Sequence, residues 1–283
     1  MLKRFYSVKE DYKVFTLTDF DDCTKDKIST IVTDNGVKSA YSFREVELST
    51  PYPVQKILRD GDDVYMFLSD KRLYKLVGKT LDRVSLTTFT DVMKVFSFYV
   101  GKSKKLCVID GEKLYFIGDT ADVISIPQHS DSVYLNGKVF FVCDAVIRYV
   151  AVSFGVLNVM RSNSKGYLSI DKKFGEILHL YPSGDNLMVI TERAIFSIEV
   201  GLTDTDMIVK KVASFKDKAL KNSASNVYRT AFFISNGKLY AFDGENTSLI
   251  PSRILLGKSI VRTIKSKDKY VLEINDGKGT KFY

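Results

Sequence analysis

Residues 106–117, Leu-Cys-Val-Ile-Asp-Gly-Glu-Lys-Leu-Tyr-Phe-Ile, contain the pattern that decides the fold. Two apolar runs, each long enough for a short strand, flank the dipeptide Asp110-Gly111. Asp-Gly readily adopts the positive φ angles of a two-residue hairpin turn, because glycine lacks a Cβ atom and aspartate tolerates the left-handed region. The segment therefore predicts an antiparallel β-hairpin.

The same hairpin pattern recurs along the chain. Residues 64–77 repeat it around Ser69-Asp70, and residues 231–242 repeat it around Asn236-Gly237. Four weaker copies are residues 28–32 with Asn35-Gly36, 139–142 with Asp144, 187–190 with Glu192, and 270–274 with Asp276-Gly277. The seven turns lie near residues 35, 70, 110, 144, 192, 236 and 276, at intervals of 34 to 48 residues. This interval is close to the length of a four-stranded propeller blade.

The chain between the hairpins has room for further strands. Residues 92–98, 123–126 and 177–181 have the apolar, β-branched and aromatic composition of strands. A lone hairpin is not stable in water, so each unit must pack against its neighbours, as it does in a ring of sheets. The last unit ends after its third strand, and two surplus β-like segments, residues 5–8 and 14–17, precede the first. We expect one of these segments to complete the last sheet and close the ring.

In its period and hairpin signature the chain resembles the β-propeller superfamily over nearly its whole length. The resemblance implies an all-β fold of about seven four-stranded blades in a single domain, residues 1–283, closed by the N-terminal strand. The chain has no Trp, which excludes the Trp-Asp dipeptide of WD40 repeats and the Trp-containing box of sialidases. Two alternatives stay open: six blades, if residues 148–175 are an insertion, and a pair of β-sandwiches split near residue 160.

Residues that could carry catalysis or hold a metal are sparse. The two histidines, His129 and His179, have no cysteine or second histidine at zinc-site spacing. Cys107 and Cys143 lie in apolar runs typical of buried, unreactive thiols, and Cys23 has no partner at short spacing. We therefore expect no catalytic residue, no metal site and no cofactor, and His179 fits a structural role.

Two other kinds of motif also fall short of a binding site. Residues 101–103 and 257–259 end like a phosphate-binding P-loop but lack its first glycine. The acidic clusters at residues 19–22 and 204–206 break the spacing of a calcium loop, at Cys23 and Thr24 and at Ile208. The cluster at residues 60–63 falls between strand-like runs, where a connection needs no ligand, and a weak calcium site is the alternative there. We interpret all three clusters as turns.

The positive charge is concentrated in the last quarter of the sequence. Residues 210–283 contain 15 Lys or Arg and 6 Asp or Glu, a net charge of +9, whereas the whole chain carries +8. Such asymmetry favours an anionic partner, and the rigid face of a propeller suits an acidic protein surface. The candidate partner-binding residues, expected mainly in connections between blades, are Lys210, Lys211, Lys216, Lys218, Lys221, Arg262, Lys265, Lys267 and Lys269.

These features predict a non-enzymatic platform for protein interaction or assembly. A structural component of a virus or phage particle, in its neck or tail, is one such role. The alternatives are a carbohydrate-active enzyme with carboxylates in the central channel, and a nucleic-acid-binding module that uses the basic quarter. Charged residues follow closely on the N-terminus, and no apolar stretch approaches the roughly 20 residues needed to span a bilayer. We therefore expect a soluble protein, cytoplasmic at synthesis, with no membrane insertion.

Overall fold

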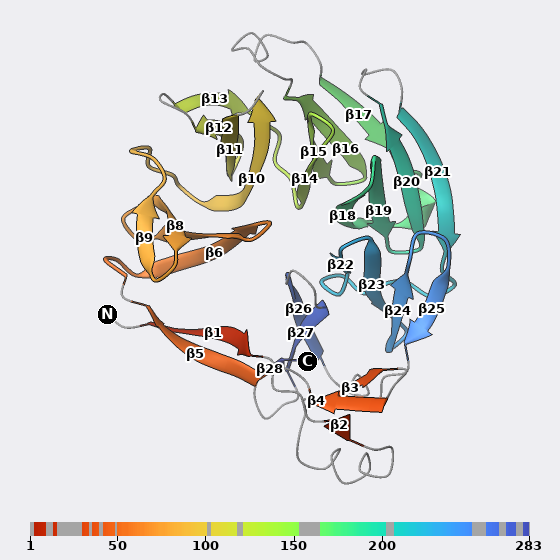
Figure 1. The fold of residues 1–283 in the computed structure, drawn as a ribbon. Coiled ribbons are helices and arrows are strands. Elements are labelled where there is room, and N and C mark those ends of the chain that lie inside the picture. Colours follow the sequence, from red (N-terminus) through yellow and green to blue (C-terminus); the bar gives the residue numbers. More distant parts are fainter. Residues whose placement is uncertain are drawn as a thin grey trace. The chain divides into compact units, whose positions relative to one another are not determined.

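The computed structural model describes residues 50–100, 103–117, 121–152, 165–201 and 207–250, and outside these ranges only strands within residues 3–48 and 259–282. Among the described residues the elements are β-strands and one short 3-10 helix (Figure 1). The chain divides into two compact units, and we describe each by itself. The first unit comprises Met1–Ile57, Val64–Thr88 and Tyr283, and the second comprises Leu58–Asp63 and Phe89–Phe282.

The first unit holds short N-terminal sheets and most of one four-stranded sheet. Strand β1 pairs with β5, and β2, β4 and β3 form a three-stranded sheet in that order. The four-stranded sheet has the order β6-β7-β8-β9. The strands are β1 (Lys3–Lys9), β2 (Val14–Phe15), β3 (Thr30–Thr33), β4 (Gly36–Ser39), β5 (Ser42–Leu48), β6 (Val54–Asp60), β7 (Asp63–Leu68), β8 (Leu73–Val77) and β9 (Thr80–Arg83).

The second unit holds four further four-stranded sheets and a three-stranded one, each antiparallel and in chain order. Their strands are β10 (Val92–Val100), β11 (Ser103–Asp110), β12 (Lys113–Ile117), β13 (Ala121–Ser125); β14 (Ser132–Leu135), β15 (Lys138–Cys143), β16 (Val146–Ala151), β17 (Lys165–Ser169); β18 (Ile177–Ser183), β19 (Asn186–Thr191), β20 (Ala194–Val200), β21 (Met207–Ser214); β22 (Ser225–Val227), β23 (Thr230–Ser235), β24 (Lys238–Phe242), β25 (Thr247–Ile250); and β26 (Ser259–Lys265), β27 (Tyr270–Asn275), β28 (Thr280–Phe282). The 3-10 helix η3 (Lys172–Phe174) lies between β17 and β18.

All seven predicted hairpins are confirmed. They are β3-β4, β7-β8, β11-β12, β15-β16, β19-β20, β23-β24 and β27-β28. The turn between β23 and β24 has φ angles of 48° at Asn236 and 68° at Gly237, the left-handed geometry that Asn-Gly supplies. Local turn chemistry therefore placed the hairpins correctly.

The three additional strands are confirmed as well, but the predicted ring closure is not. Residues 92–98 lie in β10, residues 123–126 overlap β13, and residues 177–181 lie in β18. In the described pairings, β1 pairs with β5 and β2 pairs with β4, whereas the last sheet contains β26, β27 and β28. Five sheets, not seven, have four strands among the described residues.

Both structural alternatives involve the region around residue 160. Strand β16 pairs with β17 from Val146↔Ser169 to Val150↔Lys165, so one sheet continues across residue 160. A division into two sandwiches at that point is therefore wrong. Residues 148–175, considered as an insertion, contribute to β16 and supply β17, two strands of a four-stranded sheet.

The core of the second unit lies between consecutive sheets. In β15, Phe140 and Val142 pack toward the sheet β18–β21, while Val139 and Phe141 pack toward the sheet β10–β13. This alternation follows from the two-residue period of a strand, and because both faces are covered, β15 is apolar from Val139 to Val142. Each fully buried Phe contributes about 1.5–3 kcal/mol to folding.

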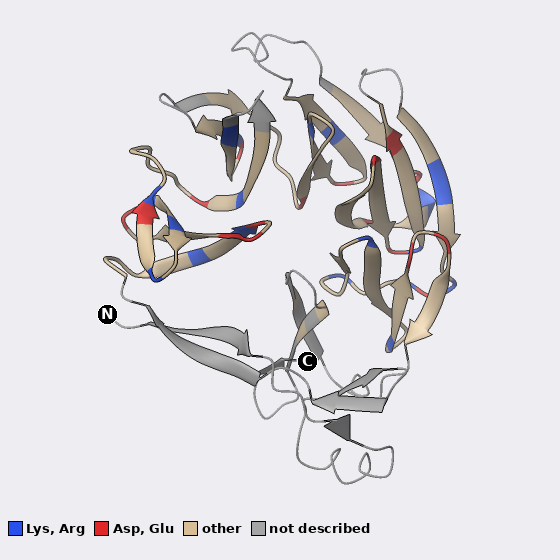
Figure 2. Ribbon diagram, viewed as in Figure 1, with Lys and Arg blue, Asp and Glu red and all other residues tan. Residues whose placement is uncertain are grey.

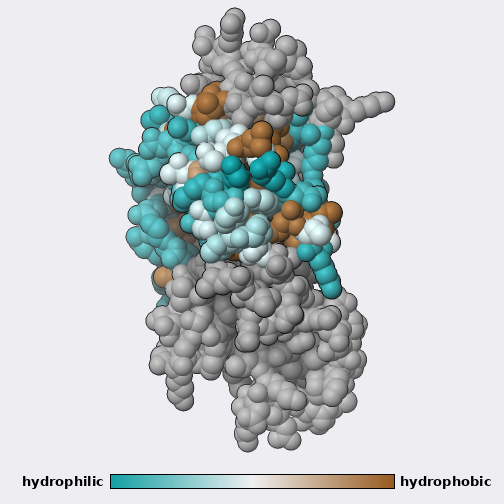
Figure 3. Space-filling model, turned by 90° about the vertical axis from the view of Figure 1, so that its left-hand side faces the viewer, coloured by the Kyte–Doolittle hydropathy of each residue, from teal (hydrophilic) through white to brown (hydrophobic). Residues whose placement is uncertain are grey.

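The surface of the described residues is mainly polar on the side where β9 lies. Figure 3 shows hydrophilic side chains there, with separate hydrophobic patches between them. Exposed apolar side chains of this part of the chain include Ile57, Val77 and Leu86. Within the described residues, no helix has the length and apolar character needed to span a bilayer.

The two cysteines that the structure describes are free. Cys107 is fully buried, as predicted, and burial raises the pKa of its thiol. Cys143 is only half-buried, which corrects the prediction that it is buried, because it ends β15 next to the turn. Burial also raises the pKa of Cys143, although the Arg148 guanidinium opposes that effect. Cys23 lies outside the described residues.

Candidate interaction surface

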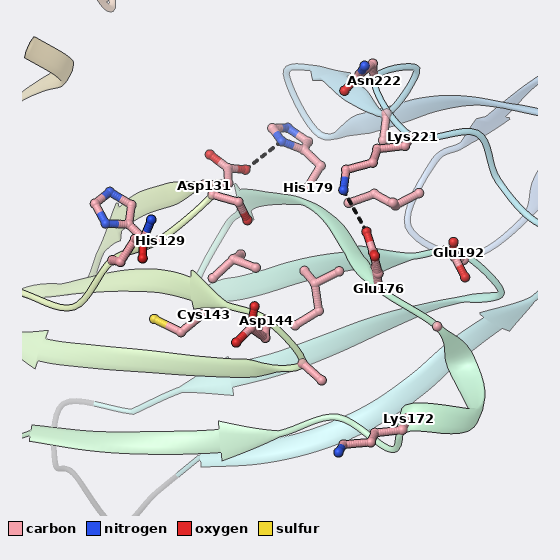
Figure 4. A pocket seen from close by; sticks show the side chains of 18 of the residues that line it. His129, Asp131, Cys143, Asp144, Lys172, Glu176, His179, Glu192, Lys221 and Asn222 are labelled. Atoms are coloured by element: carbon pink, nitrogen blue, oxygen red, sulfur yellow. Dashed lines mark hydrogen bonds and ion pairs between the residues drawn. The ribbon is translucent and has the colours of Figure 1, made fainter. Parts of the chain in front are cut away.

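Loops from three consecutive sheets meet around one large hollow. In an antiparallel sheet whose strands follow chain order, the turn between strands two and three emerges at the same end as the connection that enters strand one. The connections before β14, β18 and β22 therefore gather with the turns β15-β16 and β19-β20. They enclose a hollow of about 1170 Å³ (Figure 4).

Asp131 lies at the centre of a hydrogen-bond network beside this hollow. Its Oδ1 accepts from Ser132 N at 2.7 Å and pairs with Lys94 Nζ at 3.3 Å. Its Oδ2 accepts from His179 Nδ1 at 2.9 Å and from Leu180 N at 3.0 Å. Burial would raise the pKa of Asp131, but the Lys94 ammonium, the His179 ring and the Leu180 amide together hold it well below its usual range. Asp131 is therefore a fixed negative charge.

His179 links Asp131 to a third sheet. The second ring nitrogen, Nε2, lies 3.0 Å from Asn226 Oδ1, and Asn226 Nδ2 donates to Tyr228 O at 2.8 Å. Both ring nitrogens thus face oxygen acceptors, and among the described residues no hydroxyl or thiol is hydrogen-bonded to the ring as a nucleophile would be. The network joins Asp131, which precedes β14, to β18 and β22, the first strands of their sheets. This supports the structural role predicted for His179.

Two ion pairs tie the connection before β22 to the sheet before it. Lys218 Nζ lies 2.7 Å from Glu192 Oε2. Lys221 Nζ lies 2.8 Å from Glu176 Oε2, and Figure 4 marks this second pair. The hydrogen bond between Lys221 and Glu176 lowers the pKa of the carboxyl and raises that of the ammonium. Both lysines therefore already have intramolecular partners.

The nine candidate basic residues do not share one setting. Lys216, Lys218 and Lys221 lie exposed in the connection between β21 and β22, as predicted. Lys210 and Lys211 do not lie in a connection: they are exposed within β21, the outer strand of its sheet (Figure 2). Placing them in a connection was wrong, because the strand continues where one face meets solvent and lysines are tolerated.

The remaining four candidates belong to the last sheet or lie outside the described residues. Arg262 and Lys265 are in β26, so Lys265 ends a strand instead of lying in a connection. Lys267 and Lys269 fall outside the described residues.

Two further cations, Lys173 and Arg193, join the candidate lysines around Phe174. The ammonium groups of Lys173 and Lys211 lie 5.0 Å and 5.3 Å from the centre of the Phe174 ring, a cation–π arrangement. Arg193 N donates to Phe174 O at 3.0 Å, and Arg193 Nη1 donates to Lys216 O at 3.4 Å. We call the basic edge these four cations, Lys173, Lys211, Arg193 and Lys216, together with Lys172 and Lys210, which are their neighbours in the sequence and are also exposed.

No pattern in the sequence indicated Lys172, Lys173 or Arg193 as partner-binding residues. The first two lie in the region considered as an insertion, and Arg193 follows the Glu192 turn of the fifth hairpin. Lys173 and Arg193 lie near Lys211 because β20 pairs with β21, which places Phe196 opposite Lys211, and because Phe174 contacts Phe196.

The remaining histidine and the acidic clusters show no arrangement typical of a catalytic or metal site among the described residues. His129 Nδ1 lies 2.9 Å from Pro127 O and therefore donates to it, which leaves Nε2 as a buried acceptor. Across the described residues, no cluster of three or more His, Cys, Asp or Glu side chains has a metal-binding arrangement. The acidic cluster at residues 60–63 is confirmed as a turn, with a φ of 59° at Gly61. The clusters at residues 19–22 and 204–206 lie outside the described residues.

The comparisons with known proteins concern the fold. No protein-family model matches the chain, and no curated protein matches it. Human WBSCR16 is similar in structure with a TM-score of 0.56 and 9% identity, covering 98% of this chain and 87% of its own. Kluyveromyces lactis Hsv2 is similar with a TM-score of 0.53 and 14% identity, covering 80% and 76%. Both are β-propeller proteins, and the likeness shows a propeller-like fold alone.

Proposed function

We propose that the chain is a non-enzymatic platform that binds an acidic surface of another protein at its basic edge. One observation carries this proposal: of the six cations of the basic edge, only Lys173 has a carboxylate partner among the described residues, Asp171 at 2.6 Å. The other five present uncompensated charge. Complementary charge of this kind speeds encounter with an oppositely charged partner and rejects like-charged ones.

The environment of the aromatic residues supports a protein partner over a nucleic acid. Stacking of bases needs exposed aromatic faces beside the cations. Phe174 is half-buried, and two lysine ammonium groups lie near its ring. Tyr240 stacks on Phe233 in the core, and Tyr270 donates its hydroxyl to Ser223 O. Tyr228 is exposed, but it lies in the turn β22-β23, at the other end of its sheet.

The hollow supports a binding role more than hydrolysis. A glycoside hydrolase pairs a carboxylate with a carboxylic acid whose pKa is raised. At this hollow the pKa values of Asp131 and Glu176 are lowered, in each case with a cation nearby. His179 has both nitrogens engaged, so it does not serve as a general base in this arrangement.

For the fold we propose that the seven sheets with the predicted hairpins are blades of one closed ring. The alternating core of β15 and the similarity to propellers support this arrangement. Incorporation into a virus or phage particle stays a prediction from composition.

Charge reversal tests the proposed function. The variant carries Lys172→Glu, Lys211→Glu and Lys216→Glu, and the matched control carries Lys113→Glu, Arg229→Glu and Lys238→Glu, all exposed in the same unit. The two ligands are a glutamate-rich polypeptide and a single-stranded oligothymidine, at about 0.15 M salt.

We expect the wild-type chain to bind the polypeptide more tightly than the oligothymidine. The basic-edge variant should lose at least about tenfold in affinity for the polypeptide, and the control much less. Tight binding of the oligothymidine that the same reversals abolish would contradict the proposal and favour nucleic acid. Equal losses in both variants would show that only net charge matters and would also contradict it.

A further inference from the structure

A second hollow, of about 620 Å³, opens between the outer strands of two consecutive sheets. The end of the sheet β10–β13 contributes Ser125, Ile126 and Pro127. Strands β16 and β17 contribute the rest of the lining, which is Val146, Arg148, Tyr149, Val150, Gly166 and Tyr167.

The wall formed by β16 and β17 is mainly apolar and incompletely covered. Val146, Arg148 and Val150 alternate along β16 and so share one face of the sheet. Tyr167 is directly opposite Arg148 on β17 and is 73% exposed. Further in on the same face, Phe141 of β15, also opposite Arg148, is fully buried against the sheet β10–β13. The hollow therefore extends the packed core outward as an open apolar surface.

The charge at this surface is unbalanced. Among the described residues that line the second hollow, Arg148 is the one that carries a charge, and it is exposed. No carboxylate of the described residues forms an ion pair with it. A guanidinium beside an exposed tyrosine and aliphatic side chains has the composition of a binding hot spot, because Tyr and Arg combine large contact area with directional polar groups.

The backbone next to the hollow favours an extended ligand. Strand β17 is the last strand of its sheet, so its outer N–H and C=O groups have no partner strand in the described pairings. An added strand would place alternate side chains toward the hollow. Pro127 and Arg148 line both this hollow and the larger one, so the two form a continuous path along which a chain can run.

We propose that this groove binds an extended polypeptide segment that places a carboxylate on Arg148 and an apolar side chain against Tyr167. The inference rests on the proposed function, in that the chain binds polypeptides, but it uses residues separate from the basic edge. Arg148 selects the acidic residue by charge, and the apolar hollow selects its neighbour on the same face, two residues away.

Labelled peptides of about ten residues test the proposal. The test peptide carries Glu and Phe two residues apart in a Gly-Ser background, so that both side chains face the same way in an extended chain. Two matched peptides replace Glu by Gln or Phe by Ser. The protein variants are Arg148→Ala and Tyr167→Ala, and the control is Arg229→Ala with Tyr228→Ala, an exposed Arg and Tyr elsewhere in the same unit. Fluorescence anisotropy measures binding.

We expect saturable binding of the Glu-Phe peptide, weakened about tenfold by Arg148→Ala, whereas the Gln-Phe peptide is affected little by that change. Tyr167→Ala should weaken the Glu-Phe peptide and spare the Glu-Ser peptide. No saturable binding up to ~1 mM, or equal binding by wild-type and both variants, overturns the inference. The basic-edge variant is expected to bind this peptide normally, so loss of the groove and loss of the basic edge are separate results.

Discussion

Removal of the Asp131 carboxylate is the sharpest test of the network beside the large hollow. Asp131→Ala deletes the acceptor of Ser132 N, Leu180 N and His179 Nδ1 and the ion-pair partner of Lys94. Breaking a buried charge network by removing one partner costs about 3–5 kcal/mol. The Asp131 side chain is 23% exposed, so water replaces part of these bonds. We therefore expect the free energy of unfolding to fall by about 3 kcal/mol, the lower end of this range.

Urea unfolding followed by tyrosine fluorescence and by circular dichroism measures this loss. The control is Asp217→Ala, an exposed carboxylate that accepts from Asn236 Nδ2 at 3.3 Å, for which we expect less than about 0.5 kcal/mol. A loss for Asp131→Ala as small as that of the control would refute the reasoning.

The lowered pKa of Asp131 also predicts how the stability difference between wild-type and Asp131→Ala depends on pH. The pKa of Asp131 is lowered in the folded state, so its contribution to stability is fully present above the unfolded value, about 3.9, and is lost as pH falls toward the folded value. The difference in stability between wild-type and Asp131→Ala should therefore be constant near neutrality and shrink below about pH 4. A difference that persists unchanged into acid would contradict the assignment.

Three further predictions concern packing, thiols and closure. Gly166→Ala should lower the free energy of unfolding in urea by about 1–3 kcal/mol, because an added Cβ would overlap the phenol ring of buried Tyr149. If Gly166→Ala costs as much in a Tyr149→Leu background, the overlap is not the cause. Native thiol titration should label the half-exposed Cys143 faster than the fully buried Cys107, and rapid labelling of Cys107 would contradict its burial. Deletion of residues 1–18 removes β1 and β2 and should lower the melting temperature or cause aggregation, whereas an unchanged melting temperature would count against closure of the ring.

The sequence predicted the hairpins well because their signals are local. Asn236 and Gly237 both have positive φ angles, as predicted for a two-residue turn. In the β11-β12 hairpin Gly111 has a φ of 55°, but Asp110 ends β11, so the turn is shifted by one residue to Gly111-Glu112. The apolar runs beside the turns are an equally local signal. Lys210 and Lys211 were wrongly predicted to lie in a connection because composition alone does not distinguish an outer strand from a connection. An outer strand with one solvent-facing side carries charged residues, so its composition resembles that of a connection.

The candidate site was harder to predict because its contacts join distant parts of the chain. His179 lies 48 residues after Asp131, and Lys221 lies 45 residues after Glu176. Contacts over such distances produce no periodic pattern in the sequence, because they depend on how consecutive sheets pack against each other. The same holds for Lys173 and Arg193, which come close to Lys211 and Lys216 through the ring and carbonyl of Phe174 and the carbonyl of Lys216.

Zero-length carbodiimide cross-linking tests the central claim, that the basic edge binds an acidic protein surface, most directly. The reagent joins a ligand carboxylate to a lysine amine only where the two are in contact, so mass spectrometry of the bound glutamate-rich polypeptide identifies the lysines that touch it. We predict cross-links concentrated on Lys172, Lys211 and Lys216. Cross-links spread equally over Lys113 and Lys238, which are exposed elsewhere in the same unit, would contradict the claim.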